Sequence, residues 1–336
     1  MTTLNFNGQH IDVSTVPGKK ETSFCSDIIQ GLKSSPKYLW SKYFYDSKGD
    51  RIFQEIMQCD EYYPFKCELE IFKESTQQLA DRITFRGGGF DLIELGTGDG
   101  TKTSHLLKHL VAAGADFTYM PIDISSNIIH YLKGELMSAI PGIRIAALHG
   151  EYFDMLEKAA MLSNRRKVVL FLGSNLGNMP REEALTFCRN LRGYMHPGDI
   201  AIIGLDLKKD PATVLSAYND KGGITREFNL NLLTRINREL QANFDVGQFH
   251  HFPIYDPGTG SCKSYLISKK KQEVTLHTAG GPRVIHFSEN EEIFMEISQK
   301  YSPEQVISLA RQAGFAPAEM LFDKKKWFVD AIWEVI

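Results

Sequence analysis

What this sequence of 336 residues lacks already excludes several kinds of protein. Its five cysteines show no CxxC spacing and are odd in number, which argues against a disulfide framework and against a zinc site. No stretch reaches the run of about 18 apolar residues that spans a membrane. The first residues, MTTLNFNGQH, lack the charged and apolar regions of a secretory leader. We therefore expect a cytoplasmic chain with no membrane span and no metal ion.

The sequence also lacks an excess of basic charge. Lys and Arg total 38 against 41 acidic residues, which gives a formal net charge of -3. Binding to a phosphate backbone normally requires a basic excess. The basic runs at 269–271 and 324–326 border apolar, strand-like segments and are interpreted as solvated turns. We expect a small-molecule ligand rather than nucleic acid, and a monomer.

Short apolar runs alternate with amphipathic stretches from about residue 89 onward. Strands are expected at 90–95, 117–122, 143–148, 167–172 and 199–205, and helices near 101–113, from 125, near 153–161 and near 181–194. This alternation is typical of a mostly parallel α/β sheet with helices on both faces. KVVLFL and IAIIGL are continuously apolar, as buried parallel strands are.

The pattern changes between about 209 and 300. A long helical stretch at 224–244 precedes alternating segments at 264–268, 272–278 and 283–287, which suggest antiparallel strands. We interpret this region as an insertion that forms a second, smaller α+β lobe. A helix then begins at a capping box, with Ser302 as N-cap and Gln305 three residues later, and WFVDAIWEVI closes the chain as a final strand.

A glycine-rich turn follows the first predicted strand, in FDLIELGTGDGTKT. Gly96, Gly98 and Gly100 lie between this strand and a helix that carries Lys102 near its start. Glycines at such a turn let the backbone approach a ligand, because they lack Cβ and tolerate positive φ. The spacing is G-x-G-x-G, which differs from the G-x-G-x-x-G of dinucleotide folds.

Acidic residues follow the next two predicted strands. Asp123 ends the second strand, where nucleotide-binding α/β sheets hold ribose hydroxyls; its alternative role as a helix N-cap can be filled by Ser125. Glu151 follows the third strand and is positioned to accept a hydrogen bond from an adenine amine, with Tyr152 covering the ring; its alternative is a surface carboxylate. Together these groups favour S-adenosylmethionine (SAM) over NAD as cofactor.

Seven stretches then extend the argument to a family: KYFYDSKGDRIFQEI, EYYPFKCE, IELGTGDGTKT, FLGSNLGN, AYNDKGGITREFN, NRELQANFD and MEISQKYSPE. In order and spacing the sequence resembles the histidine Nα-methyltransferases of ergothioneine biosynthesis, within a larger group of amino-acid methyltransferases. The resemblance implies a class I, Rossmann-like methyltransferase core and an α+β lobe. The expected division is an N-terminal segment at 1–19, a substrate-binding lobe at 20–65 and 209–300, and a SAM-binding core at 66–208 and 301–336.

The resemblance also implies roles for six residues in binding the amino acid. They are Tyr45 beside the amine, Tyr62 as a second contact, Asn178 and Tyr218 at the carboxylate, and Glu296 and Ser298 at the imidazole. Four of them have alternative, purely structural interpretations. Tyr45 and Tyr62 could be core or turn residues, Asn178 could be the N-cap of a helix that begins near Pro180, and Tyr218 could be an ordinary residue on one face of a helix.

Glu296 and Ser298 carry an argument of their own. In an extended segment, residues i and i+2 point to the same side. A carboxylate and a hydroxyl side by side suit the two nitrogens of an imidazole, one as donor and one as acceptor. The alternative is a polar strand edge facing solvent.

The resemblance implies methylation of the α-amino group of free L-histidine, in three rounds that give trimethylhistidine (hercynine). Displacement at a sulfonium requires alignment and a lone pair more than a strong acid or a metal. We expect Tyr45 to orient the amine, while solvent or a carbonyl near Gly173 accepts its proton, and tyrosine faces to tolerate the growing cation.

Two departures from the family pattern leave alternatives open. Glu151 stands where the family has aspartate, and Ser264 and Tyr265 stand where the typical enzyme has Met and Trp. The same scaffold acting on a histidine ring nitrogen, or on another, aromatic amino acid, is therefore an alternative. A second alternative is a catalytically silent SAM-binding module. Such a module would not need a substrate pocket, so the presence of all six substrate-binding residues of the family pattern argues against it.

Overall fold

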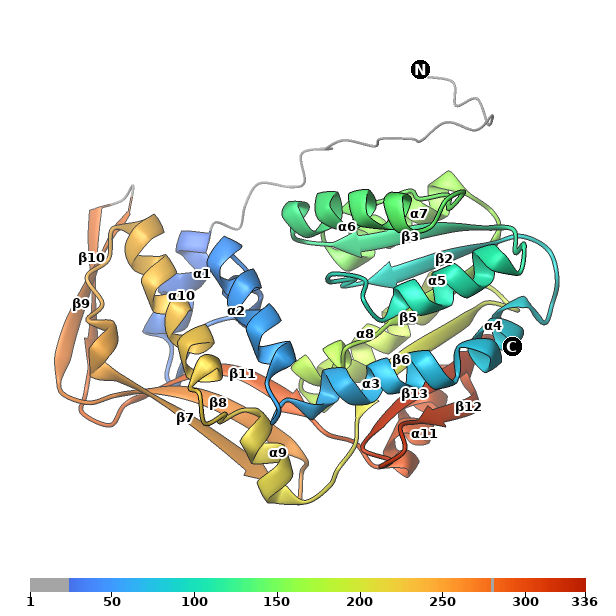
Figure 1. Cartoon of the computed structure of the whole chain (residues 1–336). Coiled ribbons are helices and arrows are strands. Elements are labelled where there is room, and N and C mark those ends of the chain that lie inside the picture. Colours follow the sequence, from blue (N-terminus) through green and yellow to red (C-terminus); the bar gives the residue numbers. More distant parts are fainter. Residues whose placement is uncertain (1–23, 279–280) are drawn as a thin grey trace.

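The computed structural model of the chain describes residues 24–278 and 281–336. Figure 1 shows two bodies side by side, one around a large sheet and one around a smaller sheet with helices packed above it. The expected segment at 1–19 lies outside the described residues. Within the described ranges no helix has both the length and the apolar character needed to cross a membrane.

The larger body is built on a seven-stranded sheet in the order β12-β13-β6-β5-β2-β3-β4. Its strands are β2 (Phe90–Leu95), β3 (Phe117–Asp123), β4 (Leu148–His149), β5 (Arg166–Phe171), β6 (Ile200–Asp206), β12 (Ala316–Phe322) and β13 (Phe328–Glu334). β2 to β6 run parallel, and β13 pairs antiparallel with both β6 and β12. The predicted α/β class with a mostly parallel sheet is confirmed.

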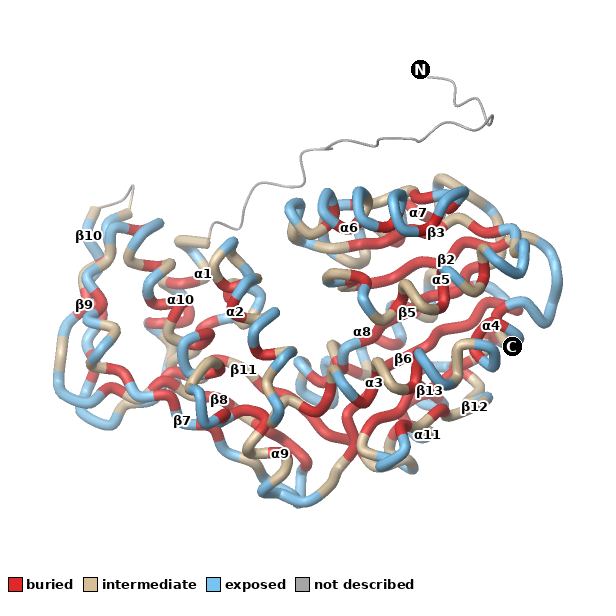
Figure 2. Tube along the Cα trace, viewed as in Figure 1, coloured by how far each residue is buried: buried red, intermediate tan, exposed pale blue. Residues whose placement is uncertain are grey.

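Helices cover both faces of this sheet because its central strands are apolar on both sides (Figure 2). α3 (Tyr63–Glu74), α4 (Thr76–Thr84), α5 (Thr103–Ala112) and α6 (Ser126–Ala139) share one hydrophobic core with residues such as Leu92. α7 (Tyr152–Leu162), α8 (Arg181–Gly193) and α11 (Pro303–Gln312) share another with Ile93. Leu92 and Ile93 are adjacent in the strand and so point to opposite faces.

The smaller body contains a four-stranded sheet in the order β1-β11-β8-β7 and a hairpin of β9 and β10. The strands are β1 (Lys37–Tyr38), β7 (Phe249–Asp256), β8 (Ser261–Ser268), β9 (Gln272–Thr278), β10 (Gly281–Phe287) and β11 (Glu292–Gln299). The helical elements are α1 (Phe24–Lys33), η1 (Ser41–Phe44), α2 (Ser47–Gln58), α9 (Pro211–Ala217), α10 (Ile224–Leu240) and η3 (Val246–Gln248). A third hydrophobic core fills the space between α1, α2, α10 and these strands.

The structure corrects two predicted elements and contains strands that were not predicted, among them β12. The strand expected at 143–148 is reduced to Leu148–His149, because the preceding residues meet β3 only through an isolated bridge between Ile145 and Tyr119. The helix expected at 224–244 ends at Leu240, where Gln241 takes a left-handed conformation with φ of 47°. β12 was not predicted, and it forms a hairpin with the predicted final strand.

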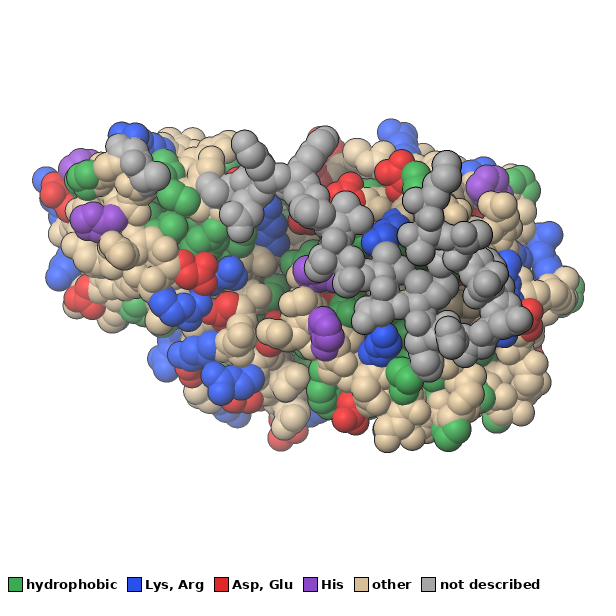
Figure 3. Space-filling view, turned by 90° about the horizontal axis from the view of Figure 1, so that it is seen from above, with side chains coloured by type: hydrophobic (Ala, Val, Ile, Leu, Met, Phe, Trp, Pro, Cys, Tyr) green, Lys and Arg blue, Asp and Glu red, His purple; other side chains and the backbone are tan. Residues whose placement is uncertain are grey.

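Charge on the surface is mixed. On the face seen in Figure 3, the Lys and Arg side chains that are visible are interspersed with acidic ones and form no continuous basic area. Within the described part of the chain, no group of three or more His, Cys, Asp or Glu side chains is arranged to hold a metal ion.

Candidate active site

Two pockets adjoin each other at the carboxyl ends of the parallel strands. The larger is lined by all six residues predicted for the cofactor, namely Gly96, Gly98, Lys102, Asp123, Glu151 and Tyr152. They come from the ends of β2, β3 and β4 and from the helices that follow, because the carboxyl ends of parallel strands meet at one edge of a sheet.

The glycine turn has the predicted backbone. Gly96, Gly98 and Gly100 have φ of 69°, 56° and 68°. A Cβ on Gly96 would lie 2.8 Å from the Tyr152 hydroxyl, and one on Gly100 would lie 2.3 Å from a methyl of Leu132. A Cβ on Gly98 would meet nothing within 4 Å, so this backbone faces open space in the pocket.

Asp123 joins this turn to the next helix. Its carboxylate accepts from the backbone N–H of Ser125 at 2.9 Å and of Gly98 at 3.4 Å. The N-cap of α6 is Ser125, whose hydroxyl accepts from the N–H of Ile128, so Asp123 is not the cap. Burial raises the pKa of Asp123 above its usual value, as expected for a carboxylate at a pocket wall.

Two buried carboxylates support the larger pocket, Glu94 in its lining and Glu68 behind it. Glu94 accepts from the hydroxyls of Thr103 at 2.7 Å and Tyr119 at 2.5 Å, and burial raises its pKa to about 7. Glu68 pairs with Lys102 and accepts from the N–H of Gly173 at 2.8 and 2.9 Å. Glu68 thereby fixes both the predicted cofactor lysine and the loop after β5.

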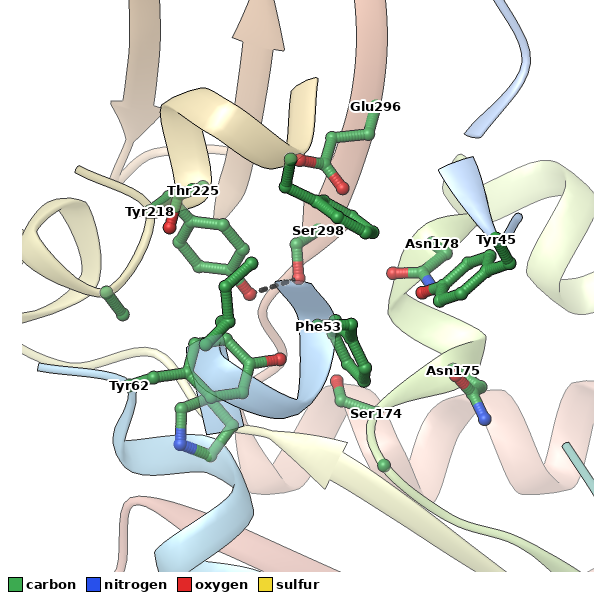
Figure 4. A pocket seen from close by; sticks show the side chains of 15 residues that line it. Tyr45, Phe53, Tyr62, Ser174, Asn175, Asn178, Tyr218, Thr225, Glu296 and Ser298 are labelled. Atoms are coloured by element: carbon green, nitrogen blue, oxygen red, sulfur yellow. Dashed lines mark hydrogen bonds between the residues drawn. The ribbon is translucent and has the colours of Figure 1, made fainter. Parts of the chain in front are cut away.

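The smaller pocket is lined by all six residues predicted for the amino acid and by Gly173. Tyr45 follows η1, Tyr62 precedes α3 and Tyr218 follows α9. Asn178 ends η2 (Asn175–Asn178), and Glu296 and Ser298 lie in β11. Figure 4 shows Tyr45 and Asn178 on one side of it and Tyr218, Glu296 and Ser298 on the other. Tyr45, Tyr62, Gly173 and Asn178 line both pockets, so ligands in the two would meet at these residues.

Tyr45 is placed by aromatic packing. Its ring lies 5.7 Å from the rings of both Phe53 and Phe228, in edge-to-face contacts. Burial raises the pKa of its hydroxyl well above the usual value, with the carboxyl of Glu296 adding to the effect. The hydroxyl therefore stays protonated, so Tyr45 can orient an amine but cannot act as a phenolate base.

Glu296 and Ser298 face the pocket from β11 rather than solvent (Figure 4). Burial raises the pKa of Glu296, and hydrogen bonding from Ser264 and from the Asn229 amide, which lies at 3.5 Å, acts in the opposite direction. The Ser298 hydroxyl accepts from Tyr218 at 2.7 Å and from Lys300 at 2.8 Å. The predicted pairing of a carboxylate and a hydroxyl on one side of a strand is present.

The interpretation of Asn178 as a helix N-cap is wrong. Asn178 is the last residue of η2, and α8 begins after Pro180, which holds the cap position without a side-chain bond. The side chain of Asn178 lines both pockets and makes no hydrogen bond to any described residue, so its amide is available to a ligand.

Ser264 and Tyr265, where the chain departs from the family pattern, lie behind or away from the smaller pocket. Ser264 is buried opposite Glu296 in the pairing of β8 with β11. Tyr265 points to the other face of the sheet, where its ring lies 5.8 Å from that of Phe294. Neither lines the smaller pocket, and Ser264 adjoins it only through Glu296.

The sequence reasoning missed two further groups of residues. Phe53 and Phe228 line the smaller pocket, and Glu68 and Lys300 lie buried behind the two sites. Alternation could have indicated Lys300, because Glu296, Ser298 and Lys300 are spaced two residues apart along the chain. No local pattern marks Glu68, whose partner Gly173 is 105 residues away.

Comparisons with known proteins agree with the motifs. A family model described as histidine-specific methyltransferase, SAM-dependent, matches residues 24–335. The chain is 32% identical over 288 residues to a histidine N-alpha-methyltransferase of Mycobacterium tuberculosis, covering 86% of this chain and 87% of that protein. It is 31% identical over 287 residues to ergothioneine biosynthesis protein 1 of Neurospora crassa, covering 84% of this chain and 31% of that protein. It is 27% identical over 320 residues to a 4-dimethylallyltryptophan N-methyltransferase of Epichloe festucae var. lolii, covering 88% of this chain and 90% of that protein.

Proposed function

This chain belongs to the family of histidine-specific, SAM-dependent methyltransferases, and from that membership we propose that it methylates the α-amino group of free L-histidine. The observation that carries the proposal is the shared wall of the two pockets, where Tyr45, Gly173 and Asn178 border both. A methyl donor in the larger pocket and an amino acid in the smaller one would face each other directly. Transfer requires this alignment.

The larger pocket suits SAM in the chemistry of its donors and acceptors. We propose that Asp123 binds the ribose, that Glu151 and Tyr152 contact the adenine, and that Gly96, Gly98 and Lys102 border the methionine part. The backbone at Gly98 faces open space in this pocket, which supports close approach of a ligand there. When bound, SAM supplies an electrophilic methyl group.

In the smaller pocket we propose that the chain holds the amino acid at three points. Asn178 and Tyr218 contact the carboxylate, Glu296 and Ser298 contact the ring, and Tyr62 borders the substrate. Tyr45 orients the amine through a hydroxyl that stays protonated. The Gly173 carbonyl accepts a hydrogen bond from the amine, and water takes up the proton that the amine must lose. Repetition would give the trimethylated product, next to the aromatic faces of Tyr45 and Phe53.

We also propose the finer organisation expected from the sequence. Residues 20–65 and 209–300 would form the substrate-binding lobe, and residues 66–208 and 301–336 the SAM-binding core. The separate hydrophobic core between α1, α2, α10 and the smaller sheet supports this division. A cytoplasmic location is proposed because all five cysteines are free thiols. A monomer is proposed as well, and light scattering of the purified chain tests it.

The decisive experiment incubates the purified chain with SAM and each amino acid in turn. We expect histidine to gain up to three methyl groups, all on the α-nitrogen when located by fragmentation in a mass spectrometer. Methyl groups on the ring would refute Nα transfer. Faster turnover of tryptophan or a prenylated tryptophan would favour the second candidate, which the similarity to a 4-dimethylallyltryptophan N-methyltransferase supports.

A further inference from the structure

A buried cation lies directly behind the smaller pocket. Lys300 has no exposed surface, and its ammonium group has three hydrogens to donate. Each has a partner: Asp206 Oδ2 at 2.6 Å, the Tyr218 hydroxyl at 2.7 Å and the Ser298 hydroxyl at 2.8 Å. Tyr218 and Ser298 line the pocket, whereas Lys300 does not. Lys300 therefore reaches a ligand in this pocket through these two hydroxyls rather than by direct contact.

Asp206, at the end of β6, holds this cation in place. Burial by itself would raise the pKa of Asp206, but Lys300 and Lys209 lower it below its usual value, so the carboxylate is ionised. Lys209 pairs with the other carboxylate oxygen, and Tyr63 donates to Asp206 at 2.8 Å. Asp206 thus carries two buried lysines, and of the two only Lys300 contacts the pocket hydroxyls.

The direction of hydrogen bonding follows from this arrangement. A hydroxyl that accepts from an ammonium group keeps its own hydrogen to donate elsewhere. Without a ligand, Tyr218 donates that hydrogen to Ser298. With an amino acid present, the hydroxyls of Tyr218 and Ser298 can both donate into the pocket while Lys300 still occupies their lone pairs.

We propose that Lys300, held by Asp206, is a positioning residue that makes Tyr218 and Ser298 hydrogen-bond donors to the bound amino acid. As a consequence the site selects the neutral imidazole ring, whose unprotonated nitrogen accepts from Ser298. This inference rests on the proposed function and deepens it. In a neutral ring one nitrogen accepts and the other donates, which matches Ser298 and Glu296. A protonated ring would place an N–H against the Ser298 hydrogen, with the charge of Lys300 behind it.

The two lysines on Asp206 provide a matched pair of variants. Lys300→Met removes the donor to both hydroxyls but leaves Asp206 paired with Lys209. We expect KM for histidine to rise about tenfold or more, with a smaller change in kcat and an unchanged Kd for SAM. Lys209→Met removes a cation from the same carboxylate without touching Tyr218 or Ser298, so KM should stay near the wild-type value. Equal KM values for the two variants would overturn the proposal.

A double-mutant cycle with Ser298→Ala separates positioning from a merely structural role. If Lys300 acts through Ser298, Lys300→Met should raise KM less in the Ser298→Ala background than in the wild type. An equal rise in both backgrounds would mean that Lys300 acts independently of that hydroxyl, and the proposal would be wrong.

A measurement on the wild type does not depend on the folding of any variant. Histidine with ¹⁵N in its ring is bound to the protein with S-adenosylhomocysteine at about pH 6, near the ordinary ring pKa. We expect the ¹⁵N spectrum to show one protonated and one unprotonated nitrogen; two protonated nitrogens would overturn the inference. A wild-type chain that binds no histidine would instead refute the proposed function, so the two failures are distinguishable.

Discussion

Asp123 is the acidic residue that borders the larger pocket between the glycine turn and α6. If it binds the ribose, Asp123→Ala should weaken SAM binding by about 1.5–3 kcal/mol, the range for hydrogen bonds to a charged group. Isothermal calorimetry measures this change. Asp123 also accepts from the backbone of Ser125, so the thermal unfolding of the variant must be compared with the wild type. An unchanged affinity in a folded variant would remove Asp123 from the site.

Glu296 is the residue expected to distinguish histidine from other amino acids. A site that hydrogen-bonds a ring nitrogen rejects analogues that lack one. Glu296→Ala should lower kcat/KM for histidine by at least about tenfold, or roughly 1.4 kcal/mol, and lower it less for phenylalanine or tryptophan. Glu292→Ala, an exposed change in the same strand, is the control. Equal losses for all amino acids would mean that Glu296 is structural.

Glu94 should make stability depend on pH. Its pKa of about 7 in the folded chain lies above the ordinary 4.5, so the folded state holds the proton over this range while the unfolded state loses it. Stability therefore falls as pH rises from about 4.5 to about 7, by about 3 kcal/mol from this group. Glu94→Gln should remove this part of the loss, measured as urea unfolding at about pH 5 and about pH 8. The same pH dependence in both proteins would contradict the raised pKa.

At the scale of elements, β6 and α3 approach each other closely at a glycine, which has no side chain to keep them apart. Gly204 in β6 lies against Glu68, and a Cβ there would be 2.1 Å from the Glu68 carboxylate. Glu68 in turn fixes the N–H of Gly173, in the loop that borders both pockets. Because Gly204 has no side chain, Glu68 of α3 can lie against β6 and hold the loop at Gly173 in place.

Gly204→Ala should therefore reduce both stability and activity. Overpacking of a buried position costs about 1–3 kcal/mol, and displacement of Glu68 would release the Gly173 loop and Lys102. Denaturant unfolding and kcat/KM measure the two effects. Gly134→Ala in α6 is a control, because a Cβ there meets nothing within 4 Å and the change should be neutral or slightly stabilising. Full activity of Gly204→Ala would show that Glu68 does not position the loop.

At the scale of the whole molecule, the smaller pocket is assembled from both bodies of the fold. Asn178 comes from the loop after β5 of the large sheet, and Glu296 and Ser298 come from β11 of the small one. A ligand held at its carboxylate and at its ring would therefore connect the two bodies. Each body by itself supplies only part of the contacts.

Histamine and histidinamide, which lack the carboxylate, test this bridging. They should be much poorer acceptors than histidine, because Asn178 and Tyr218 would be left without their charged partner. Competition assays and turnover with each compound provide the comparison. Because Asn178 is not a helix cap, Asn178→Asp has no capping role to preserve, and repulsion of the carboxylate should dominate its effect. Equal turnover of histamine would refute the carboxylate assignment.

The sequence by itself determined those features that depend on local periodicity and on strand ends. Alternating apolar runs predicted the parallel sheet, and the glycine turn, Asp123 and Glu151 follow successive strands. The carboxyl ends of parallel strands meet at one edge, so these residues line one pocket. The same logic placed Glu296 and Ser298 on one side of a strand.

Only the tertiary structure decided which residues far apart in the sequence form hydrogen bonds and ion pairs with each other. Lys300 and Tyr218 are 82 residues apart, and Glu68 and Gly173 are 105 apart. The position of Asn178 between the two pockets, the burial of Ser264 opposite Glu296 and the orientation of Tyr265 likewise depend on how β11, β8 and η2 pack together. Sequence patterns fix which face of an element a residue occupies, whereas packing between elements fixes what that face meets.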